Sequence, residues 1–241
     1  MSGMRVNDSG FVWRGTNVSR LENLSDIVFA LVLTLAALQS IPTSFDELVG
    51  LWRGAISIAL CFALILLIWR THHIFFRRFG LDDGWVTALN ALLLFLVLIY
   101  IYPLKFMTDF VVNYFSGGFN TLDEITRVLP LSQVPVLYAI YGVFFGAVYG
   151  VFGLLHAHAL RRADYLALTH EERSWTRFEI EFSVGTAILS LGVIALAFVL
   201  PTTLAPFSGV LFTLMGVIAA ICMARARKRI ATAAPLAGQA P

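Results

Sequence analysis

"RLENLSDIVFALVLTLAALQS", residues 20–40, joins a polar start to a long apolar run. Between Asp26 and Gln39, the one polar residue is Thr34. Such a run is typical of a helix that crosses a membrane. A carboxylate inside a spanning helix is costly, so Asp26 must face partner groups rather than lipid. The stretch therefore predicts a spanning helix with a polar anchor near one end.

The composition of the whole chain extends this prediction to an all-α integral membrane protein. Of its 241 residues, 59% are hydrophobic and only 13% are charged, which excludes an ordinary soluble domain. Apolar runs long enough to cross about 30 Å of hydrocarbon occur six times. They cover residues 24–40, 51–69, 85–104, 134–157, 181–200 and 204–223. We therefore predict six transmembrane helices.

The basic residues predict the orientation of these helices. Fourteen Lys and Arg residues lie in the two end segments and in the connections after the second and fourth runs, against three on the other side. The positive-inside rule therefore places both termini in the cytoplasm, for a multi-pass protein of the cell membrane. Because the basic residues are this topology signal, we expect no nucleic-acid partner.

The chain reads as one membrane domain, residues 1–229, followed by a disordered cytoplasmic tail, residues 230–241.

Gly142, Gly146 and Gly150 are spaced four apart on one helical face, and such stripes let helices approach closely. Packing within the bundle is the favoured role, with a subunit contact as the alternative. "THEE", residues 169–172, is a capping-box pattern that starts a helix before the fifth run.

Helical periodicity divides the first run into two faces. At 100° per residue, Ile27, Leu31, Thr34 and Leu38 fall within about 60° of one another. Asp26 lies roughly 110° from the centre of that stripe. The geometry therefore separates an apolar stripe with one hydroxyl from a polar anchor. The plain alternative is that the stripe packs in a core and that Thr34 bonds its own helix carbonyl.

Other polar residues are expected at the depth of Asp26. Asn90 lies in the first turns of the third run, and His72 and His73 follow the second run. These side chains can meet in one polar cluster at one level of the membrane. Arg20 is six residues before Asp26, too far for a direct pair on one straight helix.

Two short motifs carry a resemblance to a known family. "RLENLSD", residues 20–26, has the pattern Arg-x-x-x-Leu-Ser-Asp, with Thr34 eight residues after the aspartate. "WRTHH", residues 69–73, ends the second run. Together they resemble the prokaryotic branch of the lysosomal potassium-channel family, transmembrane protein 175. Leu24 and Ile27 stand where the family commonly has phenylalanine and a small residue.

The resemblance implies a potassium-permeable, moderately potassium-selective channel rather than an enzyme, without a cofactor. It implies a homotetramer in the lipid bilayer whose first helices line a central pore. The implied constriction comprises Leu31, Thr34 and Leu38, with Ile27 also lining the pore. The implied structural network comprises Arg20, Ser25, Asp26, Trp69 and His73, to which the depth argument adds His72 and Asn90.

Two other functions stay open at this point. Four histidines at the cytoplasmic ends of the second and fourth runs, His72, His73, His156 and His158, predict a metal or haem site if they converge. Adjacent histidines point to different sides of a helix, which weighs against such a site. A proton-coupled transporter using Asp26 is the other alternative.

Overall fold

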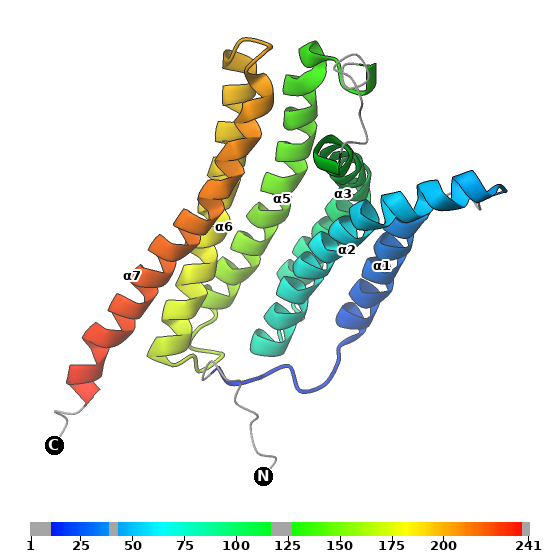
Figure 1. The fold of residues 1–241 in the computed structure, drawn as a ribbon. Helices are drawn as coiled ribbons and strands as arrows, with labels where there is room; N and C mark the ends of the chain where they lie inside the picture. Colours follow the sequence, from blue (N-terminus) through cyan, green and yellow to red (C-terminus); the bar gives the residue numbers. More distant parts are fainter. Residues whose placement is uncertain (1–10, 39–42, 117–126, 238–241) are drawn as a thin grey trace.

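The computed structural model describes residues 11–38, 43–116 and 127–237, without the side chains of residues 50–53, 114–116 and 233–237. Within these ranges the chain is helical and forms no β-sheet (Figure 1). The α-helices are α1 (Arg20–Ala37), α2 (Phe45–Phe79), α3 (Gly84–Ser116), α5 (Val134–Arg161), α6 (His170–Val199) and α7 (Leu214–Ala237). Two 3₁₀ helices, η1 (Leu131–Gln133) and η2 (Ala205–Thr213), precede α5 and α7.

Five helical segments of the described chain are long and apolar enough to cross a membrane. They are Gly54–Phe79, Gly84–Asn113, Leu131–Arg161, His170–Val199 and Ala205–Thr232. The first predicted span differs from these, since α1 has only 18 residues and three of them, Arg20, Glu22 and Asp26, are charged. The all-helical membrane architecture is thus confirmed, and the sixth crossing stays a prediction.

Several helix ends differ from the predicted runs. α2 continues ten residues beyond its predicted end at residue 69 because no Gly or Pro interrupts it before Gly80, which caps the helix in the left-handed region (φ 58°). α7 extends to Ala237 and so includes the first eight residues of the predicted tail 230–241. The remaining residues, 238–241, lie outside the described ranges.

The helices form two groups. In Figure 1, α1, α2 and α3 pack together on one side and α5, α6 and α7 on the other, and α3 lies against α5. In the first group, the core includes Phe29 and Val32 of α1, which are almost fully buried. In the second group, a Cβ on Gly146 would lie 2.3 Å from Ser190 Oγ of α6. At this position the glycine face thus packs within the bundle, which is the role that the sequence analysis favoured over a subunit contact.

The segment before α1, residues 11–19, runs across the lower end of the bundle in Figure 1. Gly15 N–H donates to Arg77 O at the end of α2 (3.1 Å), and Arg77 Nη1 donates back to Gly15 O (3.0 Å). A Cβ on Gly15 would lie 2.3 Å from Phe76 O, so this crossing requires glycine. The segment therefore lies directly against the last turn of α2.

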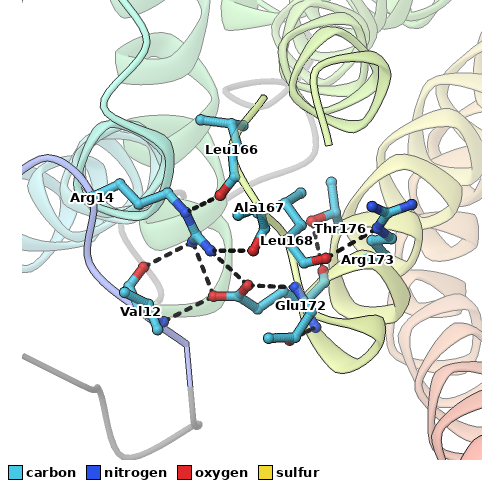
Figure 2. Close-up of polar contacts among 9 residues, drawn as sticks. Val12, Arg14, Leu166, Ala167, Leu168, Glu172, Arg173 and Thr176 are labelled. Atoms are coloured by element: carbon cyan, nitrogen blue, oxygen red, sulfur yellow. Dashed lines mark hydrogen bonds and ion pairs between the residues drawn. The ribbon is translucent and has the colours of Figure 1, made fainter. Parts of the chain in front are cut away.

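Arg14 links this segment to the connection between α5 and α6 (Figure 2). Its guanidinium pairs with both carboxylate oxygens of Glu172 (2.9 and 2.8 Å). It also donates to the carbonyls of Leu166 (2.7 Å), Ala167 (3.3 Å) and Val12 (3.1 Å). The Glu172 side chain is only 2% exposed and that of Arg14 17%, so water screens this ion pair poorly.

Glu172 is also part of the predicted capping box at the start of α6, which is confirmed. Thr169 Oγ1 accepts from Glu172 N–H (3.2 Å), and Glu172 Oε2 accepts from Thr169 N–H (2.9 Å). Val12 N–H donates to the other carboxylate oxygen (2.9 Å). One carboxylate thus caps α6 and holds the N-terminal segment of the first helix group.

We predict that Arg14→Gln destabilises the protein by about 3–5 kcal/mol, because it leaves the buried Glu172 charge without its partner. Thermal unfolding of the detergent-purified protein measures the change. Arg173→Gln is the matched control, since its partner Asp164 is 96% exposed and the loss should stay below about 1 kcal/mol. Equal losses in the two variants would contradict this assignment.

Candidate functional site

The stripe on α1 is exposed to the outside of the single chain. Ile27 is 68% exposed, Leu31 51% and Leu38 65%, and Thr34 is also exposed. The buried residues of α1 lie on the opposite face, about 180° from the stripe. They are Glu22, Ser25, Phe29, Val32 and Ala36. An exposed apolar face opposite a buried one indicates a surface that the described part of the chain does not cover.

The Thr34 hydroxyl donates to Ala30 O of its own helix (2.9 Å), as expected if the stripe only packed in a core. This bond does not bury the side chain, which stays exposed beside Leu31. Because the hydroxyl proton is directed at the helix carbonyl, the oxygen keeps its lone pairs for another group. Thr34 therefore presents an acceptor on the exposed stripe.

The C-terminal end of α1 is held from α3. Leu38 is the residue that follows the last helical residue, and its backbone N–H donates to Leu35 O (3.4 Å). Lys105 Nζ donates to Leu38 O (2.8 Å), which satisfies a carbonyl that the helix end leaves free. The contact positions Leu38 without covering its side chain.

Asp26 lies between the two faces of α1 and is held by α2. Trp69 Nε1–H donates to Asp26 Oδ1 (2.8 Å). The Trp69 indole in turn stacks on the His73 ring, with centroids 5.3 Å apart and planes 24° apart. The predicted association of Asp26, Trp69 and His73 is therefore present within one chain.

A second polar chain crosses three helices in the interior. His72 Nε2 and Asn90 Oδ1 are 2.7 Å apart, and Asn90 Nδ2 donates to Ser25 Oγ (2.9 Å). Ser25 Oγ donates onward to Leu21 O (2.8 Å). Because Asn90 Oδ1 only accepts, His72 must donate from Nε2. All three side chains are almost fully buried, so α1, α2 and α3 are joined by hydrogen bonds in the core.

Glu22 belongs to this region although the sequence reasoning did not select it. It is 3% exposed, and its Oε1 lies 3.5 Å from His73 Nδ1 and 3.6 Å from Arg77 Nε. The available signal was the Ser-x-x-Glu spacing from Ser19, whose Oγ accepts from Glu22 N–H (3.1 Å) at the start of α1.

Arg20 is placed differently from the rest of the predicted network. It lies at the first residue of α1 and is exposed, and its side chain makes no hydrogen bond or ion pair with the described part of the chain. Its predicted role stays a prediction that would require a contact beyond the described residues.

The four histidines do not converge. His72 pairs with Asn90, His73 lies beside Trp69, His156 Nδ1 lies 2.8 Å from Phe152 O, and His158 Nε2 lies 2.7 Å from Asp83 Oδ2. Among the described residues, no group of three or more His, Cys, Asp or Glu is arranged to hold a metal ion. The geometry gives no support to the metal or haem alternative.

Asp83 was not selected from the sequence, yet it joins the start of α3 to the end of α5. Its Oδ1 accepts from the backbone N–H groups of Trp85 (3.0 Å) and Val86 (3.1 Å), while Oδ2 contacts His158. Burial raises the pKa of Asp83, but the hydrogen bonds from His158 and the two backbone N–H groups outweigh it and place the pKa below its ordinary value.

Comparison with known proteins identifies the family. The family model described as endosomal/lysosomal potassium channel TMEM175 matches residues 20–101, which include both motifs. A potassium channel from Marivirga tractuosa is 35% identical over 194 residues, 79% of this chain and 77% of that protein. The chain belongs to the TMEM175 family. The family resemblance of the two motifs is thereby confirmed.

Solved TMEM175 structures share the fold. The crystal structure of a threonine-to-alanine variant of the potassium channel MtTMEM175, in complex with a nanobody–MBP fusion protein, matches with a TM-score of 0.81 and 30% identity, covering 93% of this chain and 100% of that one. A lysosomal potassium-selective TMEM175 homologue from Chamaesiphon minutus matches with a TM-score of 0.52 and 25% identity, covering 84% and 96%.

We predict that Asn90→Ala destabilises the protein by about 1–3 kcal/mol, because it leaves buried partners on His72 and Ser25 unsatisfied. Asn113→Ala is the control, since Asn113 is exposed and, among the described residues, its side chain bonds only Asp109 O of its own helix (2.9 Å). Thermal unfolding compares the two variants. A loss for Asn113→Ala as large as that for Asn90→Ala would refute the role given to the buried chain.

Proposed function

We propose that this chain forms a homotetrameric cell-membrane channel in which four copies of α1 line a central pore for potassium. TMEM175 is a family of potassium channels, so the activity is passive ion conduction and not catalysis. The observation that carries the pore assignment is the exposed stripe of α1, with Ile27, Leu31, Thr34 and Leu38 on the face opposite the core. One such stripe cannot enclose a pore alone, which is why several copies are required.

Leu31 is the proposed constriction, with Leu38 as a further apolar ring towards the outer end and Ile27 towards the cytoplasm. Apolar rings of this kind obstruct ions because water leaves a narrow apolar channel readily. The half-exposed Leu31 side chain lies near the centre of α1, with no described neighbour covering it. An ion crossing the ring must shed water without receiving carbonyl ligands.

Thr34 is the proposed hydroxyl layer next to Leu31. Its oxygen retains acceptor capacity after the bond to Ala30 O, so it can replace part of the water lost by a cation. The smaller sodium ion has the higher dehydration cost, and a few hydroxyls offset it poorly. Moderate selectivity for potassium over sodium follows.

The orientation is also part of the proposal: six crossings with both termini in the cytoplasm. The sixth crossing is α1, whose three charged residues all lie in its first two turns, where the cost of charge is lower. The two ends of the described chain lie at the same end of the bundle (Figure 1). The distribution of fourteen basic residues against three supports a cytoplasmic location for that end.

Asp26 has a structural role in this proposal rather than that of a transported-proton site. Its carboxylate is engaged by the Trp69 N–H and lies off the exposed stripe. The proton-coupled transporter therefore gains no support from the geometry around Asp26.

Ion flux in liposomes containing the purified protein tests the proposed function. We expect passive potassium flux that exceeds sodium flux and needs no proton gradient. Absence of monovalent cation flux, while a reference channel conducts in the same vesicles, would sink the proposal. Cross-linking should give a four-subunit species, and a stable dimer or trimer would exclude the tetramer.

We predict that Leu31→Asn increases potassium flux and weakens the preference for potassium, because four amides would hydrate the apolar ring. A barrier lower by about 1.4 kcal/mol corresponds to about tenfold higher flux. Leu191→Asn is the matched control, since Leu191 is 61% exposed on α6 and lies away from the proposed pore. The same flux in both variants would remove Leu31 from the constriction.

A further inference from the structure

A crevice of about 300 Å³ lies between α2, α3 and α5 and takes no part in the proposed pore. Leu64, Leu67 and Ile74 contribute one wall from α2, and Tyr141, Phe145 and Phe152 contribute the other from α5. Its walls are largely apolar side chains of membrane-spanning helices. Leu67 is 57% exposed on this wall, so the described chain leaves it uncovered.

The crevice is long enough to hold part of an acyl chain. From Leu64 to Arg70 the α2 wall advances six residues, about 9 Å at 1.5 Å per residue. The hydrocarbon core of a bilayer is about 30 Å thick, so this part of the wall covers about a third of it. The dimensions suit an acyl chain lying along the helix.

Arg70 gives the crevice a cationic group, four residues before Ile74 on the α2 wall. Its side chain lines the crevice and is exposed, and this side chain makes no ion pair or hydrogen bond with the described residues. The next two arginines of α2 differ, since Arg77 lies near Glu22 (3.6 Å) and Arg78 near Glu179 (3.4 Å). Thus one uncompensated guanidinium faces an apolar crevice, and its fork of N–H donors fits a phosphate.

We propose that this crevice binds an anionic phospholipid of the cytoplasmic leaflet, with one acyl chain along α2 and α5 and its phosphate on Arg70. The choice of leaflet rests on the orientation given under the proposed function. Cytoplasmic leaflets carry anionic lipids, and basic pockets between spanning helices are sites where their headgroups bind. Charge complementarity at Arg70 selects an anionic lipid over a zwitterionic one.

Native mass spectrometry of the full chain in detergent, with added phosphatidylglycerol or phosphatidylcholine, tests the site. We expect phosphatidylglycerol to be retained in preference to phosphatidylcholine. Arg70→Gln should lower retention of phosphatidylglycerol about fivefold, the value for one basic residue near a membrane surface. Arg227→Gln removes another exposed arginine, from α7 and away from the crevice, and should leave retention unchanged.

Filling the crevice tests the acyl-chain part separately. Leu67→Trp should reduce lipid retention while Arg70 is intact, and Leu67→Phe should do so to a smaller extent with less risk to assembly. Equal retention of the two lipids, equal effects of Arg70→Gln and Arg227→Gln, or full retention in both Leu67 variants would overturn the proposal. A crevice filled by a second copy of the chain would exclude phosphatidylglycerol and overturn it too.

Flux measurements on the same preparations separate this site from the proposed function. Protein that retains phosphatidylglycerol through Arg70 but conducts no cation would refute the channel and leave the lipid site standing. Protein that conducts potassium with no preference for phosphatidylglycerol would refute the lipid site alone.

Discussion

The buried hydrogen-bond chain from His72 through Asn90 to Ser25 is the contact on which the placement of α1 depends. It joins α2, α3 and α1 at one level, where the side chains are almost fully buried. Polar groups at that depth cannot exchange their partners for water without cost, so the arrangement is specific as well as stabilising. A purely apolar contact would allow α1 to rotate or slide, whereas these bonds fix which face of α1 points inward. The outward direction of Leu31 and Thr34 is the consequence.

Other contacts position α1 at both ends. At the N-terminal end, Asp26 bonds Trp69, and the segment before α1 is tied to the α5–α6 connection by Arg14 and Glu172. At the C-terminal end, Lys105 bonds the Leu38 carbonyl. The polar residues of α1 and of its flanking segments thus hold the helix in position. Its exposed apolar residues make no such contacts and are the ones proposed to control ion passage. A stationary helix is what a narrow apolar ring requires, because its radius depends on small displacements.

The sequence alone predicted several contacts of this site. The residues that it did not predict, Glu22 and Asp83, each have a physical reason. Periodicity alone separated Asp26 from the stripe of Leu31, and the cost of charge in a membrane indicated that Asp26 needed partners. Trp69 was expected beside Asp26 and bonds it, and His73 stacks on the Trp69 indole. Glu22 was missed because a carboxylate in the first turn of a helix usually faces water, and its burial depends on α2. Asp83 was missed because its partner His158 lies 75 residues away in the sequence.

Composition and hydrophobic periodicity by themselves determined a helical membrane protein and the division of the first helix into two faces, and two short motifs carried the resemblance to the TMEM175 family. These properties follow from local side-chain chemistry, so no knowledge of neighbouring helices was necessary. Only the tertiary structure decided which residues bond across helices: Asn90 bridges His72 and Ser25, and Arg14 reaches Glu172. It also leaves the Arg70 side chain beside an apolar crevice, without a partner among the described residues. Such pairings depend on how distant segments pack, and residues far apart along the chain carry no local pattern that specifies their distance in space.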